Sequence, residues 1–145
     1  MNKLLPIMFA ATILSNCTSL TYGEKARLQE LRAEGITVDR PMSNWERPAN
    51  PAGAAALNIL PGFGNFYLAA GDAGDSNFYL YGFLNLLTWP ISVIWGIPEA
   101  AIDANTINKR DLVFYYDYDR QGKARLAEIM AENAKKPTIN LTKEK

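Results

Sequence analysis

The chain has 145 residues, with 15 Lys plus Arg, 15 Asp plus Glu, one cysteine and no histidine. This length is typical of one small domain, and the balanced charge gives no overall field that would attract nucleic acid. The absence of histidine excludes Ser-His and Cys-His catalysis and ordinary zinc sites, so we expect neither a metal nor a cofactor.

Charged residues are unevenly distributed along the chain. Residues 48–71 and 76–98 contain no Asp, Glu, Lys or Arg, whereas the segments on either side are densely charged. This contrast, together with the N-terminal sequence, predicts four regions: a leader over residues 1–16, a charged segment and linker over 17–50, an apolar membrane-associated hairpin over 51–108, and a charged end over 109–145.

The first residues place one lysine before an apolar run from Leu4 to Leu14. This pattern is typical of a secretory signal peptide, and the run is shorter than the ~20 apolar residues that span a bilayer. Leu14-Ser15-Asn16-Cys17 resembles the lipobox of bacterial lipoproteins, with Asn16 where Gly, Ala or Ser is usual. The resemblance implies cleavage before Cys17 and attachment of diacylglycerol to its sulfur.

The same resemblance implies a location. Each buried acyl methylene contributes roughly 0.8 kcal/mol, so two or three chains such as palmitate would anchor Cys17 stably to membrane lipid. Thr18, in place of Asp, resembles the sorting signal of outer-membrane lipoproteins. We therefore expect a protein of the cell envelope with its charged segments in the periplasm, in the outer rather than the inner membrane.

Two charged segments have helical periodicity. The first covers residues 24–34 and stops at Gly35, and the second covers residues 122–136 and stops before Pro137. Seven of eleven positions are identical between residues 25–35 and 123–133. Three explanations of this similarity stay open: common origin, mutual pairing, and two ordinary solvated helices that share a composition.

Between the first charged helix and the apolar region, residues 39–51 contain three prolines and two charged pairs, which predicts an extended connector. Asn50-Pro51 then predicts a helix start, because Asn can cap and Pro is preset for the first turn. That helix stops at Pro61-Gly62 after about ten residues, or ~15 Å, so it cannot cross a membrane alone.

Residues 58–75 are rich in glycine but lack the features of a phosphate-binding loop. The stretch has no lysine for a Walker motif, and no third glycine follows Gly62 and Gly64 in the register of a dinucleotide fingerprint. We interpret the glycines as turn and close-packing residues and the aromatic rings as interfacial anchors. The predicted membrane-turn and interface residues are Pro61, Gly62, Gly64, Phe66, Tyr67, Trp89 and Trp95.

Residues 76–98 form the longest apolar run and are long enough to span a bilayer. Pro90 lies inside the run, which predicts a kinked helix or two half-helices. Glu99 and Asp103 follow one turn apart, so we expect them to mark the edge of the apolar region and to pair with Lys109 or Arg110. A buried helix held between partners is the alternative to membrane contact.

Residues 56–108 resemble the two-transmembrane-helix (TM-two) domain. Its pattern combines a Gly-rich turn, a Phe-Tyr-Leu element, a second apolar helix and a Trp followed by an Asp. The matching residues are Gly62, Gly64, Phe66, Tyr67, Leu68, Trp95 and Asp103, while Asn65 replaces the usual His-Arg. The resemblance implies a membrane hairpin and no shared reaction.

Paired carboxylates are the only catalytic option that the composition leaves. The candidates are Asp72 with Asp75, Glu99 with Asp103, and Asp117 with Asp119, and none lies beside a recognisable substrate motif. We interpret such pairs as solvated helix or loop ends, so we expect no enzyme and identify no small-molecule substrate. Residues 111–119, DLVFYYDYD, predict one short strand.

The sequence thus predicts a mainly α fold, an apolar helical hairpin with Pro and Gly kinks flanked by two charged amphipathic helices and one short strand. The expected function is that of a small lipid-anchored module of the cell envelope, structural or interacting, with membrane lipid and either a second copy or an envelope protein as partners. The alternative is a component of an oligomeric channel or transport assembly formed by the hairpin, with Glu99 and Asp103 lining the passage.

Overall fold

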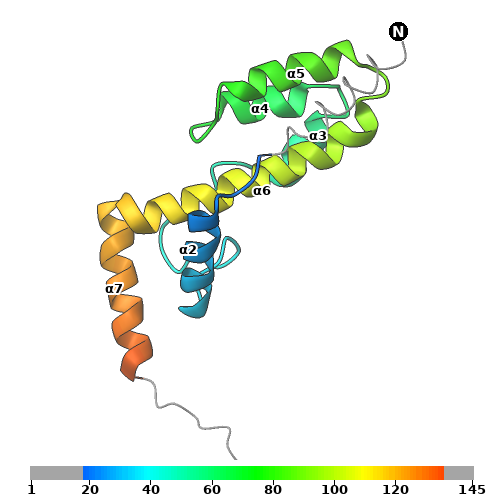
Figure 1. Cartoon of the computed structure of the whole chain (residues 1–145). Helices are drawn as coiled ribbons and strands as arrows, with labels where there is room; N and C mark the ends of the chain where they lie inside the picture. Colours follow the sequence, from blue (N-terminus) through cyan, green and yellow to red (C-terminus); the bar gives the residue numbers. More distant parts are fainter. Residues whose placement is uncertain (1–17, 136–145) are drawn as a thin grey trace, which may run out of the picture.

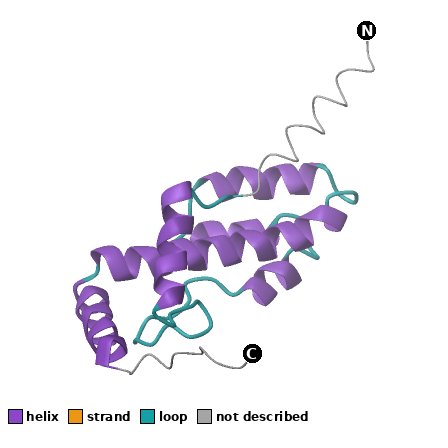
Figure 2. Cartoon of the chain, turned by 60° about the horizontal axis from the view of Figure 1, so that its bottom comes forward, coloured by secondary structure: helices purple, strands orange, loops and turns teal. Residues whose placement is uncertain are grey.

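The computed structural model describes residues 18–135 (Figure 1). Within this range the chain forms six helices and no strand, so the prediction of a mainly α fold is confirmed (Figure 2). Residues 1–16 and Cys17, on which the leader and lipidation predictions rest, lie outside this range. The helices are α2 (Tyr22–Ala33), α3 (Pro51–Leu57), α4 (Phe63–Ala70), α5 (Asn77–Leu87), α6 (Val93–Tyr118) and α7 (Arg120–Lys135).

The 26-residue helix α6 connects the two halves of the molecule. At 1.5 Å per residue it is about 39 Å long. Its first half packs with α3, α4 and α5 around a core rich in alanine, and its second half packs with α2, α7 and the connector around larger side chains (Figure 1). The first core contains Ala49, Ala54, Leu68, Phe78, Ala100, Ala104 and Ile107, and the second contains Leu31, Ile36, Trp45, Leu112, Val113, Tyr116 and Ile129. The predicted region boundary after residue 108 falls inside this helix.

The predicted strand over residues 111–119 is wrong, because these residues form the last turns of α6. Leu112 and Tyr116 are fully buried four residues apart, while Phe114 and Tyr118 stack on the outer face with ring centroids 5.1 Å apart. This is the spacing of a helix with one buried face. The aromatic composition favours a strand locally, but packing against α2 and α7 determines the observed structure.

The two charged helices are confirmed as α2 and α7. A capping box between Thr21 and Glu24 begins α2. Equivalent positions of the two similar segments face one core: Leu31 and Ile129 are buried in it, and Leu28 and Leu126 pack against it. The two helices therefore contribute to one core, in which each packs against α6.

The connector before α3 has no regular structure and is held against α6 by side chains. Trp45 Nε1 donates to Asp111 Oδ2 at 2.7 Å, and the Tyr116 hydroxyl donates to the Pro41 carbonyl. Asn108 binds both backbone groups of Ala49, accepting from its N–H at 3.0 Å and donating to its carbonyl at 2.8 Å. These bonds explain how a proline-rich segment becomes a fixed part of the fold.

Both predicted breaks in the apolar region are observed. Asn50 caps α3 by accepting from the Gly53 N–H, as expected, and the chain turns between α3 and α4 at Gly62, which has φ +86°. The run over residues 76–98 is divided between α5 and α6 at residues 88–92, around Pro90. Among the helices of residues 18–135, none is both long and apolar enough to cross a membrane.

Candidate functional site

Large apolar side chains are exposed over α5 and over the turns at one end of the molecule. The α3–α4 turn and the α5–α6 turn both lie at this end (Figure 1). We call the set formed by twelve of these side chains the apolar surface: Leu57, Ile59, Leu60, Phe63, Tyr79, Leu80, Phe83, Leu86, Leu87, Trp89, Ile91 and Ile94. Its members come from four helices and the turns between them.

The exposed fractions of these twelve side chains run from 42% at Leu57 to 79% at Ile94. Because no charged residue occurs in residues 48–71 or 76–98, no charged side chain from these segments interrupts the apolar surface. Large exposed apolar patches on folded proteins commonly mark contact with a protein or a membrane. Among residues 18–135, the apolar surface is therefore the strongest candidate for a binding surface.

The seven predicted turn and interface residues divide into two groups. Pro61, Gly62 and Gly64 are buried and shape the α3–α4 turn, so they support the surface without forming it. Gly64 N–H donates to Asn58 Oδ1 at 3.1 Å, which closes that turn.

The aromatic members of the prediction lie closer to the surface. Trp89 is 64% exposed in the α5–α6 turn, whereas Trp95 is half-buried and donates from Nε1 to Asn85 Oδ1 at 3.3 Å. Phe66 and Tyr67 are half-buried, and the Tyr67 hydroxyl accepts from the Asn50 N–H. Of these four rings, only Trp89 is exposed.

A buried polar cluster lies beneath the apolar surface. Asn85 Nδ2 donates to Asn65 Oδ1 at 3.1 Å, and its backbone carbonyl accepts from the Ser92 hydroxyl at 2.6 Å. Asn58, Asn65 and Asn85 are all buried, one each from the α3–α4 turn, α4 and α5. Side-chain amides can bond in several directions at once, so these residues tie the short apolar helices together where their backbones approach.

Glu99 and Asp103 lie on the buried face of α6 beside this cluster, 8% and 0% exposed. Burial raises the pKa of Glu99, the nearby charge of Asp103 raises it further, and a hydrogen bond with Asn85 opposes both effects. Burial also raises the pKa of Asp103, against the hydrogen bonds that it accepts from Thr18. Both carboxyl groups therefore bind protons more readily than exposed ones.

The prediction that Glu99 and Asp103 pair with Lys109 or Arg110 is wrong. Asp103 Oδ1 accepts from the backbone N–H and the hydroxyl of Thr18, at 3.0 and 2.6 Å. Arg110 instead forms an ion pair with Glu24, with Nε and Oε1 2.8 Å apart. No ion pair joins Glu99 or Asp103 to a basic residue in the part of the chain that the structure describes.

The raised pKa of Glu99 predicts a pH-dependent stability. A carboxyl group whose pKa is raised on folding stabilises the folded state at pH values below its ordinary pKa, which is 4.5 for glutamate. This stabilisation is lost as the pH rises through the raised pKa of the folded protein. We expect Glu99→Gln to increase the melting temperature near neutral pH and to have little effect in acid. Thermal unfolding in detergent at several pH values measures this. The exposed Glu128→Gln is the control, and an equal shift at every pH would contradict the expectation.

Three of the four carboxylates in the other predicted pairs have structural partners. Asp75 Oδ1 accepts from the Asn77 N–H, and Asp119 Oδ1 accepts from the Gln121 and Gly122 N–H groups at the start of α7. Asp117 pairs with Arg27 at 2.7 Å. Within residues 18–135, no group of three or more His, Cys, Asp and Glu side chains is placed to hold a metal ion.

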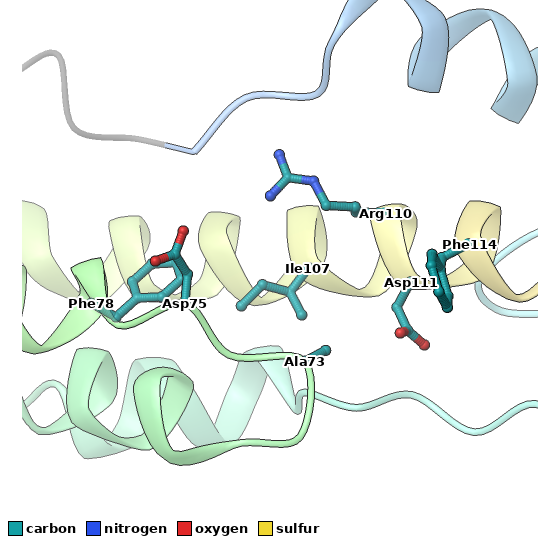
Figure 3. Close-up of a pocket in the computed structure, with 7 residues that line it drawn as sticks. All are labelled: Ala73, Asp75, Phe78, Ile107, Arg110, Asp111 and Phe114. Carbon is teal, nitrogen blue, oxygen red and sulfur yellow. The ribbon is translucent and has the colours of Figure 1, made fainter.

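A shallow hollow of about 170 Å³ lies between α6 and the start of α5 (Figure 3). Arg110 and Asp111 come from α6 and Asp75 from the loop before α5, and the Arg110 guanidinium extends toward the segment before α2. Arg110 is already bonded to Glu24 and to the Ser19 carbonyl. The three charged residues that line the hollow therefore all have structural partners, since Asp111 accepts from Trp45 and Asp75 accepts from the Asn77 N–H.

Sequence reasoning missed the three buried asparagines. Their signal was present, because Asn58, Asn65 and Asn85 are polar residues inside otherwise apolar segments. It also missed the contact of Thr18 with Asp103, which joins residues 85 positions apart and has no local signature.

A scan against protein-family profiles, a search of curated proteins and a search of solved structures each found no match. The resemblances to a lipoprotein signal and to the TM-two domain therefore stay predictions.

Proposed function

We propose that this protein is a lipid-anchored module of the bacterial cell envelope that contacts a membrane in two ways. Acyl chains on Cys17 would attach it, and the apolar surface would contact the acyl region of one leaflet. The charged half formed by α2, the second half of α6 and α7 would remain in the periplasm and be available to another envelope protein or a second copy.

The apolar surface is the observation that carries this proposal. Its side chains project from α3, α4, α5 and α6 and from both turns at one end, rather than from a single helix face. A protein partner of ordinary size covers one face, whereas a lipid leaflet surrounds an inserted end on all sides. The break at residues 88–92 and the short helices favour contact with one leaflet over crossing the bilayer.

Metabolic labelling tests the attachment. Cells producing the wild-type chain or Cys17→Ala would be given radiolabelled palmitate, and their membranes would then be separated by density and washed with carbonate. We expect label on the wild-type protein in the outer-membrane fraction and none on Cys17→Ala. Wild-type protein without label, or label that persists in Cys17→Ala, would overturn the proposal.

An oligomeric channel is the second candidate, favoured by the two carboxylates within the apolar half of the molecule. Both face the interior of a single chain, since Asp103 is fully buried and Glu99 nearly so. Lining a passage between copies would require this bundle to open. Ion flux through liposomes carrying the purified protein separates the two functions, because a lipid-anchored module should conduct no ions.

A further inference from the structure

Residues 18–21 lie along α6 and are bonded to it at two levels. At one level Asp103 Oδ1 accepts both hydrogen bonds from Thr18. At the other, Arg110 Nη2 donates to the Ser19 carbonyl at 3.3 Å, and Arg110 also pairs with Glu24 in the first turn of α2. Figure 3 shows the Arg110 side chain on the side of α6 that faces this segment.

The dimensions of the segment match those of the helix beneath it. Asp103 and Arg110 are seven residues apart, or about 10 Å along α6. Three extended residues, from Thr18 to Thr21, cover about 10 Å. Thr21 then closes the capping box of α2 with Glu24, the same residue that binds Arg110. The segment is therefore fixed at both ends, and its fixed N-terminal end is Thr18.

Thr18 is the residue directly after the predicted lipidation site, and cleavage before Cys17 would leave its N–H and hydroxyl unchanged. Asp103 lies nine residues after Ile94, which is about 13 Å along α6. This length is close to half of the ~30 Å hydrocarbon core of a bilayer. The contact of Thr18 with Asp103 would thus lie about one leaflet's depth from the exposed end of the apolar surface.

We propose that residues 18–21 act as a strap that fixes Thr18, the residue next to the acyl anchor, at Asp103, so that the apolar surface enters one lipid leaflet end-on with α6 steep to the membrane. Asp103 would then lie at the level of the lipid headgroups. Without the strap, the anchor would be a flexible tether and would not set the depth of the apolar surface. This inference rests on the proposed function and adds the orientation to it.

The three tryptophans allow this orientation to be measured. Acylated protein retaining only Trp89 (Trp45→Phe and Trp95→Phe) would be reconstituted in phosphatidylethanolamine–phosphatidylglycerol vesicles containing lipids brominated at shallow or deep acyl positions. A second protein would retain only Trp45, which lies in the core around the second half of α6. We expect deep bromines to quench Trp89 and neither set to quench Trp45. Equal quenching of both tryptophans would overturn the orientation.

Variants of Asp103 then test the strap. Asp103→Leu removes the acceptor of both hydrogen bonds from Thr18, so we expect the ratio of deep to shallow quenching of Trp89 to fall about twofold or more. Asp103→Asn keeps an Oδ1 acceptor and should preserve the wild-type ratio. Thr18→Val, which removes only the hydroxyl donor, should give an intermediate value.

Co-sedimentation with the same vesicles separates the two proposals. An acylated Asp103→Leu protein that sediments with vesicles and keeps the wild-type quenching ratio would overturn the strap and leave the proposed function standing. Wild-type acylated protein with unquenched Trp89 would instead overturn membrane contact by the apolar surface, and the strap with it.

Amide exchange over residues 18–24 in detergent should rise in Asp103→Leu, and unchanged exchange would also contradict the strap.

Discussion

Glutamate at two positions of the apolar surface should weaken membrane binding by about three orders of magnitude. Leu87 and Ile94 are 65% and 79% exposed, so Leu87→Glu with Ile94→Glu should leave the fold intact. Withdrawing each side chain from lipid removes roughly 1.5–3 kcal/mol, or about 4 kcal/mol for both, which corresponds to about 1,000-fold in affinity. The measurement is vesicle co-sedimentation of the mature chain carrying Cys17→Ala, so that no acyl anchor masks the loss.

A matched control uses two apolar side chains outside this surface. Tyr118 and Met130 are also exposed, on α6 and α7 in the charged half of the molecule. Tyr118→Glu with Met130→Glu adds the same charge and should leave vesicle binding within about twofold of the parent protein, since surface substitutions away from an interface have small effects. Equal weakening by the two pairs of substitutions would contradict a specific role for the apolar surface.

Gly62→Ala should be among the most destabilising single substitutions. Gly62 has φ +86°, where a β-carbon causes strain, and that atom would lie only 2.8 Å from the Gly82 carbonyl carbon. Strain of about 1 kcal/mol and overpacking of about 1–3 kcal/mol should together lower the free energy of unfolding by about 2–4 kcal/mol. Denaturant unfolding in detergent, followed by circular dichroism, measures the change.

Gly23→Ala is the control for this substitution. Gly23 lies in the first turn of α2, and a β-carbon there would meet no atom within 4 Å. Alanine is favoured over glycine in a helix, so we expect a stabilisation of up to about 1 kcal/mol. If Gly62→Ala were as well tolerated as Gly23→Ala, the close approach of the α3–α4 turn to α5 would be wrong.

Local signals in the sequence predicted the elements whose ends depend on neighbouring residues. Asn50-Pro51 predicted the start of α3, the glycines predicted a close-packed turn, and Pro90 predicted a break in the apolar run. Each of these depends on backbone geometry that one or two residues determine. The charged helices were predictable for the same reason, since their periodicity and stop signals lie within a few turns.

Features that depend on distant contacts could not be predicted in this way. Residues 111–119 have the composition of a strand, yet Leu112 and Tyr116 form a helix because α2 and α7 supply a core on one side. Arg110 was expected to pair with Glu99 or Asp103, but α2 brings Glu24 to it. In both cases the deciding partner lies far away in the sequence, where periodicity gives no information.

The candidate surface was predictable in composition and not in shape. Charge-free segments indicated an apolar region, but the same pattern was compatible with a spanning helix. The structure divides the run between α5 and α6 and buries Pro61, Gly62 and Gly64, so that leucine, isoleucine and Trp89 form much of the exposed area. The polar cluster of Asn58, Asn65 and Asn85 beneath it depends on three separate elements and could only be found in the folded chain.

Lipid photocrosslinking in cells would test membrane contact by the apolar surface most directly. Cells producing the wild-type protein would be fed a photoactivatable fatty acid and irradiated, and the lipid-modified peptides would be mapped by mass spectrometry. If the apolar surface contacts lipid, we expect lipid adducts in residues 57–63 and 80–94 and none in residues 22–45 or 120–135. Adducts confined to Cys17, with residues 57–63 and 80–94 crosslinked to protein instead of lipid, would contradict it.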